Sequence, residues 1–359
     1  IMKKRIFILG STGSIGESSL KIISCKKKLF KIITLIANSD YKKICYQIIN
    51  YKPNHFVITD KNVFSKVKKK FKKSKTKIFN HYSEISKEKR KVDLTIAAIP
   101  GIKGLQFTID YTKKSKKILI ANKESIICGW NIIKKISQKY HTEIIPLDSE
   151  HFSIYKLTKN HKDSEIDKIY ITASGGPFLK LPKKKFSNIS VKKALKHPNW
   201  KMGRKITIDS STLMNKVFEV IEAKNLFNLS YKKISILTHP KSYIHAIIKF
   251  NNGITKILIH DPDMKIPIYN SIYKDKIKKI ATKKLDIKIL NNPTLKEVNL
   301  SKFPLVTILK NLPKKNSLFE TILVTVNDYF VFKFLEKKID YKKIIKLIFK
   351  ILNSNEFVR

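Results

Sequence analysis

The glycine-rich stretch at residues 10–16 constrains the fold more than any other part of this sequence. It follows the short apolar run 5–9 and precedes residues 18–23, where apolar side chains have helical spacing. A strand, a glycine turn and a helix in this order open a dinucleotide-binding fold, because the glycines let a pyrophosphate approach the helix N-terminus. The spacing is G-x-x-G-x-x-G rather than G-x-G-x-x-G, so an ordinary strand-to-helix turn explains this stretch equally well when it is taken alone.

Further apolar runs with strand-like composition follow within residues 1–147. Lysine-rich stretches with helical spacing separate them, and strands that alternate with helices predict a parallel, doubly wound sheet. The first of these runs ends at Asn38-Ser39-Asp40, where a Rossmann domain binds the adenosine ribose. The runs are 31–37, 55–58, 93–98, 117–121 and 143–147.

Two carboxylates, Asp148 and Glu150, come directly after the last of these runs. Ligands in α/β enzymes bind at the carboxyl ends of strands, and carboxylate oxygens suit Mg²⁺ or Mn²⁺ better than Zn²⁺. Glu219 is the best candidate for a third ligand. Taken alone, an Asp-x-Glu pair is more typical of a solvated turn or a helix N-cap.

A helix is predicted after residues 209–212, whose polar side chains are expected to cap it. Asn215 and Glu219 then lie one turn apart on a shared face, with Lys216 beside them. Without its context, this pattern is more typical of an amphipathic helix whose charges face water.

The polar segment 174–204 is predicted to be a lid, because long loops inside compact domains usually are lids or disordered. Gly175, Gly176 and Gly203 allow hinge motion at its ends, and it carries Trp200 and Met202, which a merely solvated loop gains nothing by exposing.

Residues 234–259 have a β-like pattern with Asn251-Asn-Gly253 as a hairpin turn. These strands are expected to form an antiparallel sheet, in which His239 and His245 are structural rather than ligands. Residues 319–352 are predicted to be helical.

The chain has a formal net charge of +48, which would usually indicate a nucleic-acid-binding protein. The lysines are scattered through almost every segment, with no Arg-rich arm. We therefore favour compositional drift over a specific nucleic-acid partner, and expect the charge to steer small anionic ligands inward.

The three cysteines, Cys25, Cys45 and Cys128, lack metal-ligand spacing and indicate a reducing compartment. No apolar window approaches the roughly 18 residues that span a bilayer, and no signal-peptide core follows the first residues. We expect a cytoplasmic protein without a membrane partner.

Seven motifs, in order, resemble those of the 1-deoxy-D-xylulose 5-phosphate reductoisomerases, which depend on NADPH and a divalent metal. They are GSTGSIG at Gly10, ANKES at Ala121, PLDSEH at Pro146, ASGGPF at Ala173, HPNWKMGRKITIDSSTLMNK at His197, HPKSYIH at His239 and PDMKIPI at Pro262. The resemblance implies conversion of 1-deoxy-D-xylulose 5-phosphate to 2-C-methyl-D-erythritol 4-phosphate in isoprenoid precursor synthesis, with NADPH and Mg²⁺ or Mn²⁺.

The resemblance also implies roles for individual residues. Asp148, Glu150 and Glu219 would hold the metal and act in catalysis together with Lys123 and His197. The phosphosugar substrate would contact Lys123, Ser149, Glu150, Ser174, His197, Trp200, Met202, Ser210, Asn215, Lys216 and Glu219. NADPH would contact Thr12, Gly13, Ser14, Ile15, Asn38, Ser39, Asn122, Glu124 and Gly203.

The expected fold class is α/β: an N-terminal Rossmann-like doubly wound parallel sheet, a central α+β catalytic domain with a lid loop, and a C-terminal helical domain. The dinucleotide-binding domain is expected at 1–147, the catalytic domain at 148–285, a linker at 286–310 and a shortened helical domain at 311–359. The resemblance implies a homodimer.

One departure from the family concerns cofactor choice. The family often has a basic residue after the second strand, where this chain has Asn38-Ser39-Asp40. Asn38 and Ser39 can hydrogen-bond a 2′-phosphate and Lys42 or Lys43 can supply positive charge, whereas Asp40 opposes it.

Two alternatives stay open: another NAD(P)-dependent aldehyde or semialdehyde oxidoreductase, and a basic nucleic-acid-binding protein on a Rossmann-like scaffold. The ordered metal triad and the phosphate pocket argue against both.

Overall fold

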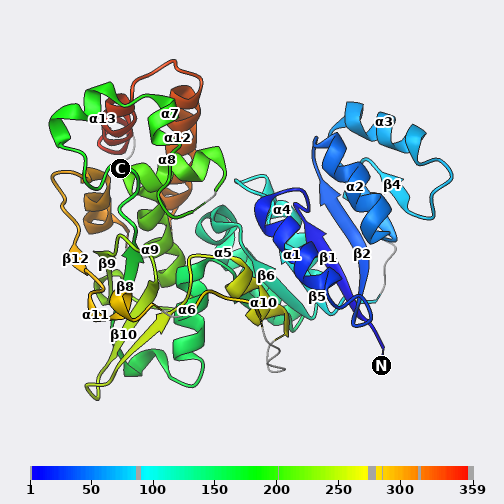
Figure 1. Cartoon of the computed structure of the whole chain (residues 1–359), viewed down its shortest axis with the longest axis horizontal. Helices are drawn as coiled ribbons and strands as arrows, with labels where there is room; N and C mark the ends of the chain where they lie inside the picture. Colours follow the sequence, from blue (N-terminus) through cyan, green and yellow to red (C-terminus); the bar gives the residue numbers. More distant parts are fainter. Residues whose placement is uncertain are drawn as a thin grey trace. The chain divides into compact units, whose positions relative to one another are not determined.

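The computed structural model describes residues 2–85, 90–200, 202–273, 280–284, 286–313 and 317–354. The chain folds into two units (Figure 1). The first comprises residues 1–148 and 264–280, and the second comprises residues 149–263 and 281–359.

The first unit is built on a seven-stranded sheet in the order β4-β3-β2-β1-β5-β6-β7. All its strand pairs are parallel. This arrangement confirms the predicted doubly wound parallel sheet. The strands are β1 (Lys4–Leu9), β2 (Phe30–Ala37), β3 (His55–Ile58), β4 (Lys77–Phe79), β5 (Leu94–Ala97), β6 (Lys117–Ile120) and β7 (Glu143–Pro146).

The central strands of this sheet are buried along continuous runs, as in a parallel sheet covered on both faces. Ile6, Ile8 and Ile96 are completely buried, and so is Phe56 on β3. The sequence did not predict β4, because this strand has only three residues and none of them is buried.

Helices connect the strands of the first unit, and several begin at a polar cap. Asp40, Asp60 and Asn122 each accept a hydrogen bond from a backbone N–H of the helix that follows, which satisfies a donor left over at the helix end. The helices are α1 (Ser14–Ser24), α2 (Tyr41–Tyr51), α3 (Lys61–Lys70), the 3₁₀ helix η1 (Tyr82–Ile85), α4 (Gly104–Lys113), α5 (Lys123–Lys139) and α10 (Lys265–Tyr273).

The second unit contains a five-stranded sheet in the order β11-β10-β8-β9-β12. The Asn251–Gly253 turn joins β10 to β11 as predicted. Strand β10 pairs antiparallel with β11 on one side and with β8 on the other. The expectation that the strands in residues 234–259 form an antiparallel sheet is correct for β10 and β11, but β9 does not pair with them and instead pairs in parallel with β8. The strands are β8 (Ile166–Ala173), β9 (Ile234–Thr238), β10 (Ile244–Phe250), β11 (Thr255–Ile259) and β12 (Lys296–Glu297).

Helix α9 packs against β8 and β9, and α6 packs against β10 and β11 (Figure 1). The helices of this unit are α6 (Ser149–Thr158), η2 (Asp163–Glu165), η3 (Lys183–Asn188), α7 (Val191–Ala194), α8 (Arg204–Thr212), α9 (Met214–Leu226), η4 (Tyr231–Lys233), α11 (Ile287–Asn291), η5 (Pro304–Asn311), α12 (Phe319–Leu335) and α13 (Tyr341–Leu352).

The prediction that residues 209–212 cap the following helix is wrong. These residues form the last turn of α8 and are buried, and α9 begins after Leu213, which has a left-handed backbone (φ 59°). A bulky residue in this region costs about 1–3 kcal/mol and persists only where the surroundings impose it. The turn at Leu213 sets the angle between α8 and α9.

Much of the predicted lid packs into the second unit instead of forming a free loop. Phe178, Phe186, Ile189 and Ala194 are buried, and the rings of Phe178 and Phe186 lie edge-on to Tyr341 at 5.3 and 6.0 Å. The end of this segment is less buried, because Trp200 and Met202 are half-buried and Gly203 is exposed.

The division into units differs in two places from the predicted domain ranges. Residues 264–280 belong to the first unit, where α10 contacts α1 and the Tyr273 hydroxyl donates to the Ile22 carbonyl at 3.3 Å. Residues 281–359 belong to the same unit as residues 149–263. None of the helices in the described ranges is long and apolar enough to cross a membrane.

Candidate active site

Three carboxylates gather at the start of α6 and on α9. One oxygen each from Asp148, Glu150 and Glu219 can be chosen so that all three lie within 4.8 Å of one another. Glu150 lies in the first turn of α6, and Asp148 is bonded directly to the first residue of that helix. The chain itself therefore holds Asp148 beside Glu150, and α9 brings Glu219 to them across the sequence.

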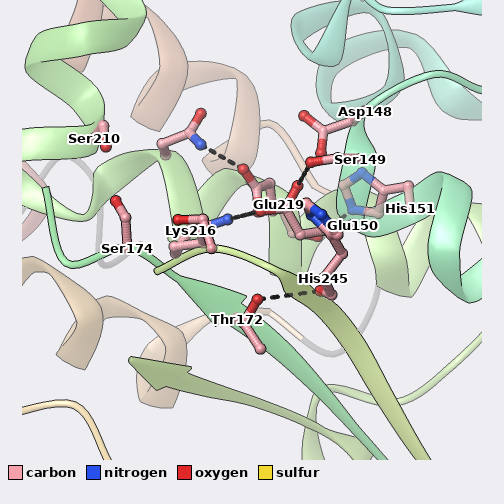
Figure 2. Close-up of polar contacts among 12 residues, drawn as sticks. Asp148, Ser149, Glu150, His151, Thr172, Ser174, Ser210, Lys216, Glu219 and His245 are labelled. Atoms are coloured by element: carbon pink, nitrogen blue, oxygen red, sulfur yellow. Dashed lines mark hydrogen bonds and ion pairs between the residues drawn. The ribbon is translucent and has the colours of Figure 1, made fainter. Parts of the chain in front are cut away.

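Each of these carboxylates contacts a lysine ammonium. Lys216 Nζ bonds both Glu150 and Glu219, the latter at 2.6 Å, and Lys123 Nζ lies 3.2 Å from Asp148 Oδ2. Figure 2 shows Lys216 directed at Glu219. Lys216 is 7% exposed and Glu219 only 1%, so these charges attract each other far more strongly than a surface pair would.

The donor set fits a hard divalent cation. The three carboxylates, one on α6, one just before α6 and one on α9, offer oxygen ligands only, which is the chemistry that Mg²⁺ and Mn²⁺ prefer. The ammonium of Lys216 already lies between the oxygens of Glu150 and Glu219, so the two carboxylates face a common cation position. Asn215 supports Glu219 by donating to its other oxygen.

The sequence did not predict two further buried residues beside these carboxylates, His151 and Glu222. Asp148, His151 and Glu222 form a second group whose ligand atoms lie within 4.8 Å of one another. His151 Nε2 donates to the backbone carbonyl of Glu219 at 2.8 Å, which ties α6 to α9. The spacing Glu219-x-x-Glu222 placed both carboxylates on one helix face and could have revealed the second.

Ser174, His197 and Ser210 form a polar group from three separate segments. His197 Nε2 lies 3.1 Å from both Ser174 Oγ and Ser210 Oγ. Its Nδ1 accepts the backbone N–H groups of Asn199 and Trp200, so the ring proton must be on Nε2. Burial, and then the positive charge of Lys216, lower the pKa of His197 to about 4, which keeps the ring neutral.

A close backbone approach holds Ser174 against α8. The Gly176 N–H donates to Ser174 Oγ at 3.1 Å, and a Cβ on Gly176 would lie 2.8 Å from the carbonyl oxygen of Ser210. Gly176 also has a positive φ of 64°, so both space and conformation require glycine there. In Figure 2, Ser174 and Ser210 lie on one side of Lys216 and Asp148 on the other.

The Trp200 ring contacts one of two stacked histidines. Its ring meets that of His245 edge-on at 6.2 Å, and His245 stacks on His260 at 3.7 Å. A cavity of about 800 Å³ lies nearby in the same unit, and its walls include Ser174, Phe178 and Pro198. The indole is thus half-buried against His245 and is not part of the core.

In the first unit, the glycine loop between β1 and α1 has the geometry that a dinucleotide site needs. Gly10 has a φ of 82° and a Cβ there would lie 2.5 Å from the Ala98 carbonyl oxygen, while a Cβ on Gly16 would lie 2.4 Å from that of Gly10. Gly13 is the N-cap of α1 without a side-chain cap, so its helix N-terminus can accept an anion. Of the predicted cofactor residues, Thr12 and Gly13 belong to this loop, and Ser14 and Ile15 are the first two residues of α1.

Polar contacts fix the glycine loop to α2. Ser11 Oγ donates to Gln47 Oε1 at 2.7 Å and Gln47 returns a bond to the Ser11 carbonyl at 2.8 Å. Lys43 Nζ lies 3.1 Å from both the Thr12 carbonyl oxygen and Glu17 Oε2.

The remaining predicted cofactor residues lie at strand ends, with one exception. Asn38 and Ser39 are exposed directly after β2. Asn122 and Glu124 lie at the start of α5 after β6, and Asn122 donates to the Gly101 carbonyl at 2.9 Å while it caps the helix. Gly203 belongs to the second unit, where it is the N-cap of α8.

A doubly wound parallel sheet with a glycine loop at its first strand defines a dinucleotide-binding protein of the Rossmann class, and the second unit adds an acidic, lysine-bridged cluster. Family models of 1-deoxy-D-xylulose 5-phosphate reductoisomerase match residues 6–129, and those of its C-terminal domains match residues 144–227 and 259–359.

Reductoisomerases of several bacteria are similar to the chain along nearly all its length. The enzyme of Pelagibacter ubique is 54% identical over 357 residues, which cover 99% of this chain and 92% of the relative. That of Persephonella marina is 37% identical over 354 residues, with coverages of 99% and 92%. The chain belongs to the 1-deoxy-D-xylulose 5-phosphate reductoisomerase family.

Solved structures of this family have the same fold. A crystal structure of DOX-P reductoisomerase with NADPH, fosmidomycin and magnesium has a TM-score of 0.91 and 31% identity, covering 99% of this chain and 90% of that one. The Zymomonas mobilis enzyme with NADPH has a TM-score of 0.89 and 30% identity, with coverages of 98% and 92%.

Proposed function

We propose that Asp148, Glu150 and Glu219 hold the divalent cation, Mg²⁺ or Mn²⁺, of this reductoisomerase. As a family member, the chain converts 1-deoxy-D-xylulose 5-phosphate to 2-C-methyl-D-erythritol 4-phosphate with NADPH. The observation that carries the proposed site is the gathering of three carboxylate oxygens within 4.8 Å. A bound divalent cation there supplies Lewis-acid stabilisation of the charge that develops on the substrate oxygens.

Lys216 and Lys123 are the charged side chains that can respond to the substrate. Lys216 forms ion pairs with both Glu150 and Glu219. A cation that takes over these carboxylates frees the Lys216 ammonium for an anionic substrate group, on the side of the site where Ser210 lies. Lys123, at the start of α5, is buried and can donate to a sugar oxygen next to Asp148.

The phosphate of the substrate is proposed to bind at Ser174, Ser210, Asn215 and Lys216. These side chains offer hydroxyl, amide and ammonium donors, and phosphate oxygens accept such bonds strongly. The neutral His197 donates from Nε2 toward the two serines and so orients their hydroxyl groups. Binding energy from this remote group orients the reacting carbons.

The cofactor side of the proposal concerns the first unit. The glycine loop would bind the NADPH pyrophosphate at the N-terminus of α1, and Asn38 and Ser39 would meet the adenosine end. NADPH held there would supply the hydride for the reduction half of the reaction. Trp200 and Met202 would exclude water from the bound substrate, which strengthens the charge interactions of the site.

The wider setting also remains a proposal: a cytoplasmic enzyme that acts as a homodimer on a small phosphosugar. The net charge of +48 draws anionic metabolites toward the site and needs no nucleic-acid partner. A different aldehyde or semialdehyde oxidoreductase is not favoured, since the family match covers both units.

The deciding experiment measures NADPH oxidation by the purified protein. We expect oxidation only when 1-deoxy-D-xylulose 5-phosphate and Mn²⁺ or Mg²⁺ are both present, and product analysis should give 2-C-methyl-D-erythritol 4-phosphate. Oxidation that proceeds equally well in EDTA would contradict the metal site, because the proposed ligands would then have no cation to hold.

A further inference from the structure

We infer that a polar cluster between α8 and α12, made of Lys205, Asp209, Asn327 and Asp328, positions Ser210 for the substrate phosphate. We call these four residues the α8–α12 clamp. The inference rests on the proposed function, because it assumes that Ser210 binds phosphate. None of the four is among the residues assigned above to substrate, metal or cofactor, so they act as positioning residues.

Asp209 is the centre of the clamp. Asn327 Nδ2 donates to Asp209 Oδ1 at 2.8 Å, and Lys205 Nζ lies 3.0 Å from Asp209 Oδ2. Lys205 also reaches Asp328 Oδ1 at 2.7 Å. Each oxygen of Asp209 is thus held by a different partner, one on its own helix and one on α12, so the carboxylate is fixed in rotation as well as in place.

The clamp is buried where such contacts matter. Asp209 is 1% exposed and Asn327 is completely buried. A buried carboxylate depends on its hydrogen-bond and charge partners, because water cannot replace them. Loss of one partner therefore favours a shift of α8 that returns Asp209 toward solvent, and such a shift would move Ser210, the next residue in the chain.

A second contact holds the other neighbour of Ser210. The Ser211 hydroxyl donates to the Ile208 carbonyl at 2.7 Å, so the Tyr341 hydroxyl, 3.1 Å away, is the donor to Ser211 Oγ. Tyr341 opens α13 and is buried among aromatic rings, including Phe178 and Phe334. It cannot follow Ser211 if α8 moves.

The contacts of Asp209 with α12 and of Ser211 with α13 connect these two C-terminal helices to Ser210 in the active site. Residues 209 and 211 are fixed by α12 and α13, whereas the side chain of Ser210 between them is directed at His197. Precise placement is needed because a hydrogen bond to phosphate weakens steeply with distance and angle.

The test compares Asn327→Leu and Tyr341→Phe with Thr325→Val, a change on the exposed side of α12. We expect the Kd of inorganic phosphate, measured by calorimetry, to rise about tenfold in Asn327→Leu and about threefold in Tyr341→Phe. The KM for the phosphosugar should rise by the same factors while the KM for NADPH stays unchanged. Thr325→Val should match the wild type in all three quantities.

A role exchange provides the rescue. Asp209→Asn alone should weaken phosphate binding, and the double variant Asp209→Asn/Asn327→Asp should restore it in part, because the exchange keeps an amide-to-carboxylate hydrogen bond between α8 and α12 but removes the ion pair of residue 209 with Lys205. If Asn327→Leu does not fold, Tyr341→Phe, which removes one hydroxyl, decides the matter.

The inference is overturned if folded variants bind phosphate like the wild type, or if Thr325→Val weakens binding as much as they do. Calorimetry with phosphate needs no turnover. A wild-type protein that binds phosphate but does not convert the phosphosugar would therefore contradict the proposed function and leave the clamp to be judged separately.

Discussion

The glycine loop of the first unit and the Glu150–Lys216–Glu219 cluster of the second, which is part of the proposed carboxylate site, would bind charged groups by opposite means. In the loop, backbone geometry would provide the site, and Gly13 and Ser14 are exposed. In the carboxylate site, buried charged side chains provide it, and residues such as Lys216 and Glu219 are held by each other.

This difference determines how each site tolerates change. A backbone site depends on space and φ angles, so adding one methyl group at a crowded glycine damages it. A side-chain site depends on charge and hydrogen-bond balance, so replacing an oxygen by nitrogen damages it although the shape is kept.

The largest effect is expected for Glu219→Gln. The amide keeps the shape of the side chain but removes one negative charge from the proposed metal site, and with it the ion pair between Lys216 and Glu219. We expect kcat to fall by at least about 10²- to 10³-fold, while the Kd of NADPH, measured by fluorescence, changes little because its loop lies in the other unit. Glu297→Gln, at an exposed position, is the control. A near-wild-type rate at low Mn²⁺ would show that Glu219 is no ligand.

A smaller but clear effect is expected for Gly16→Ala. The new Cβ would lie 2.4 Å from the Gly10 carbonyl oxygen and 2.6 Å from Ser11 Cα, both backbone atoms that cannot turn away. We expect a loss of about 2 kcal/mol in stability, seen as a lower Tm, and weaker NADPH binding.

Gly13→Ala is the matched comparison for stability. A Cβ there would meet only the Gly10 carbonyl oxygen, at 3.4 Å, and Gly13 has an ordinary φ of −77°. Its Tm should stay close to that of the wild type. Equal losses in the two variants would mean that crowding does not explain the glycines of this loop.

The same contrast explains how much could be predicted from the sequence. The parallel sheet was predictable, because strands buried on both faces appear as continuous apolar runs separated by helical stretches. The glycine loop was recognisable because backbone crowding demands particular residue types at fixed spacing. Strand β4 was not predictable, because its three residues are at least partly exposed and too few to show an apolar pattern.

Long-range arrangement was harder to predict. The parallel pairing of β8 with β9 depends on a crossover of some sixty residues, which no local pattern encodes. The run 209–212 looked like a helix cap because its residues favour caps, yet Asn327 and Lys205 supply partners that let Asp209 stay inside α8. The carboxylate cluster unites residues about seventy positions apart. Only the resemblance to the family supported the choice of Glu219 as its third member.

An exposed charge beside the proposed cofactor site, Asp40, is expected to affect the preference for NADPH over NADH only slightly. Asp40 Oδ1 accepts from the Lys43 N–H at 3.0 Å, and its Oδ2 lies 3.9 Å from Lys43 Nζ. Asp40→Asn can keep the cap while removing a negative charge next to Ser39. We expect kcat/KM with NADPH to rise about two- to threefold, since an exposed charge is largely screened, and kcat/KM with NADH to stay constant. An unchanged ratio of the two would remove Asp40 from cofactor selection.

The smallest effect concerns the pH dependence that the buried side-chain site imposes on stability. The folded pKa of His197 is lowered to about 4, mainly by burial, whereas an unfolded histidine titrates near 6.5. Between these values the unfolded chain binds a proton that the folded chain does not, so the free energy of unfolding decreases as pH falls from about 6.5 to about 4. Above 6.5 this contribution does not change.

His197→Asn separates this effect from the other histidines, because Asn can still accept the backbone N–H groups that bond Nδ1 but does not titrate. The stability difference between wild type and variant should shift by about 1 kcal/mol between pH 7.5 and pH 4.5, after allowance for solvent screening, with the wild type losing more. NMR titration should show the imidazole of the substrate-free protein neutral at pH 5.5 with the proton on Nε2. A ring that protonates near pH 6.5 would mean that burial does not govern this site, and the two regions would then differ less than their structures indicate.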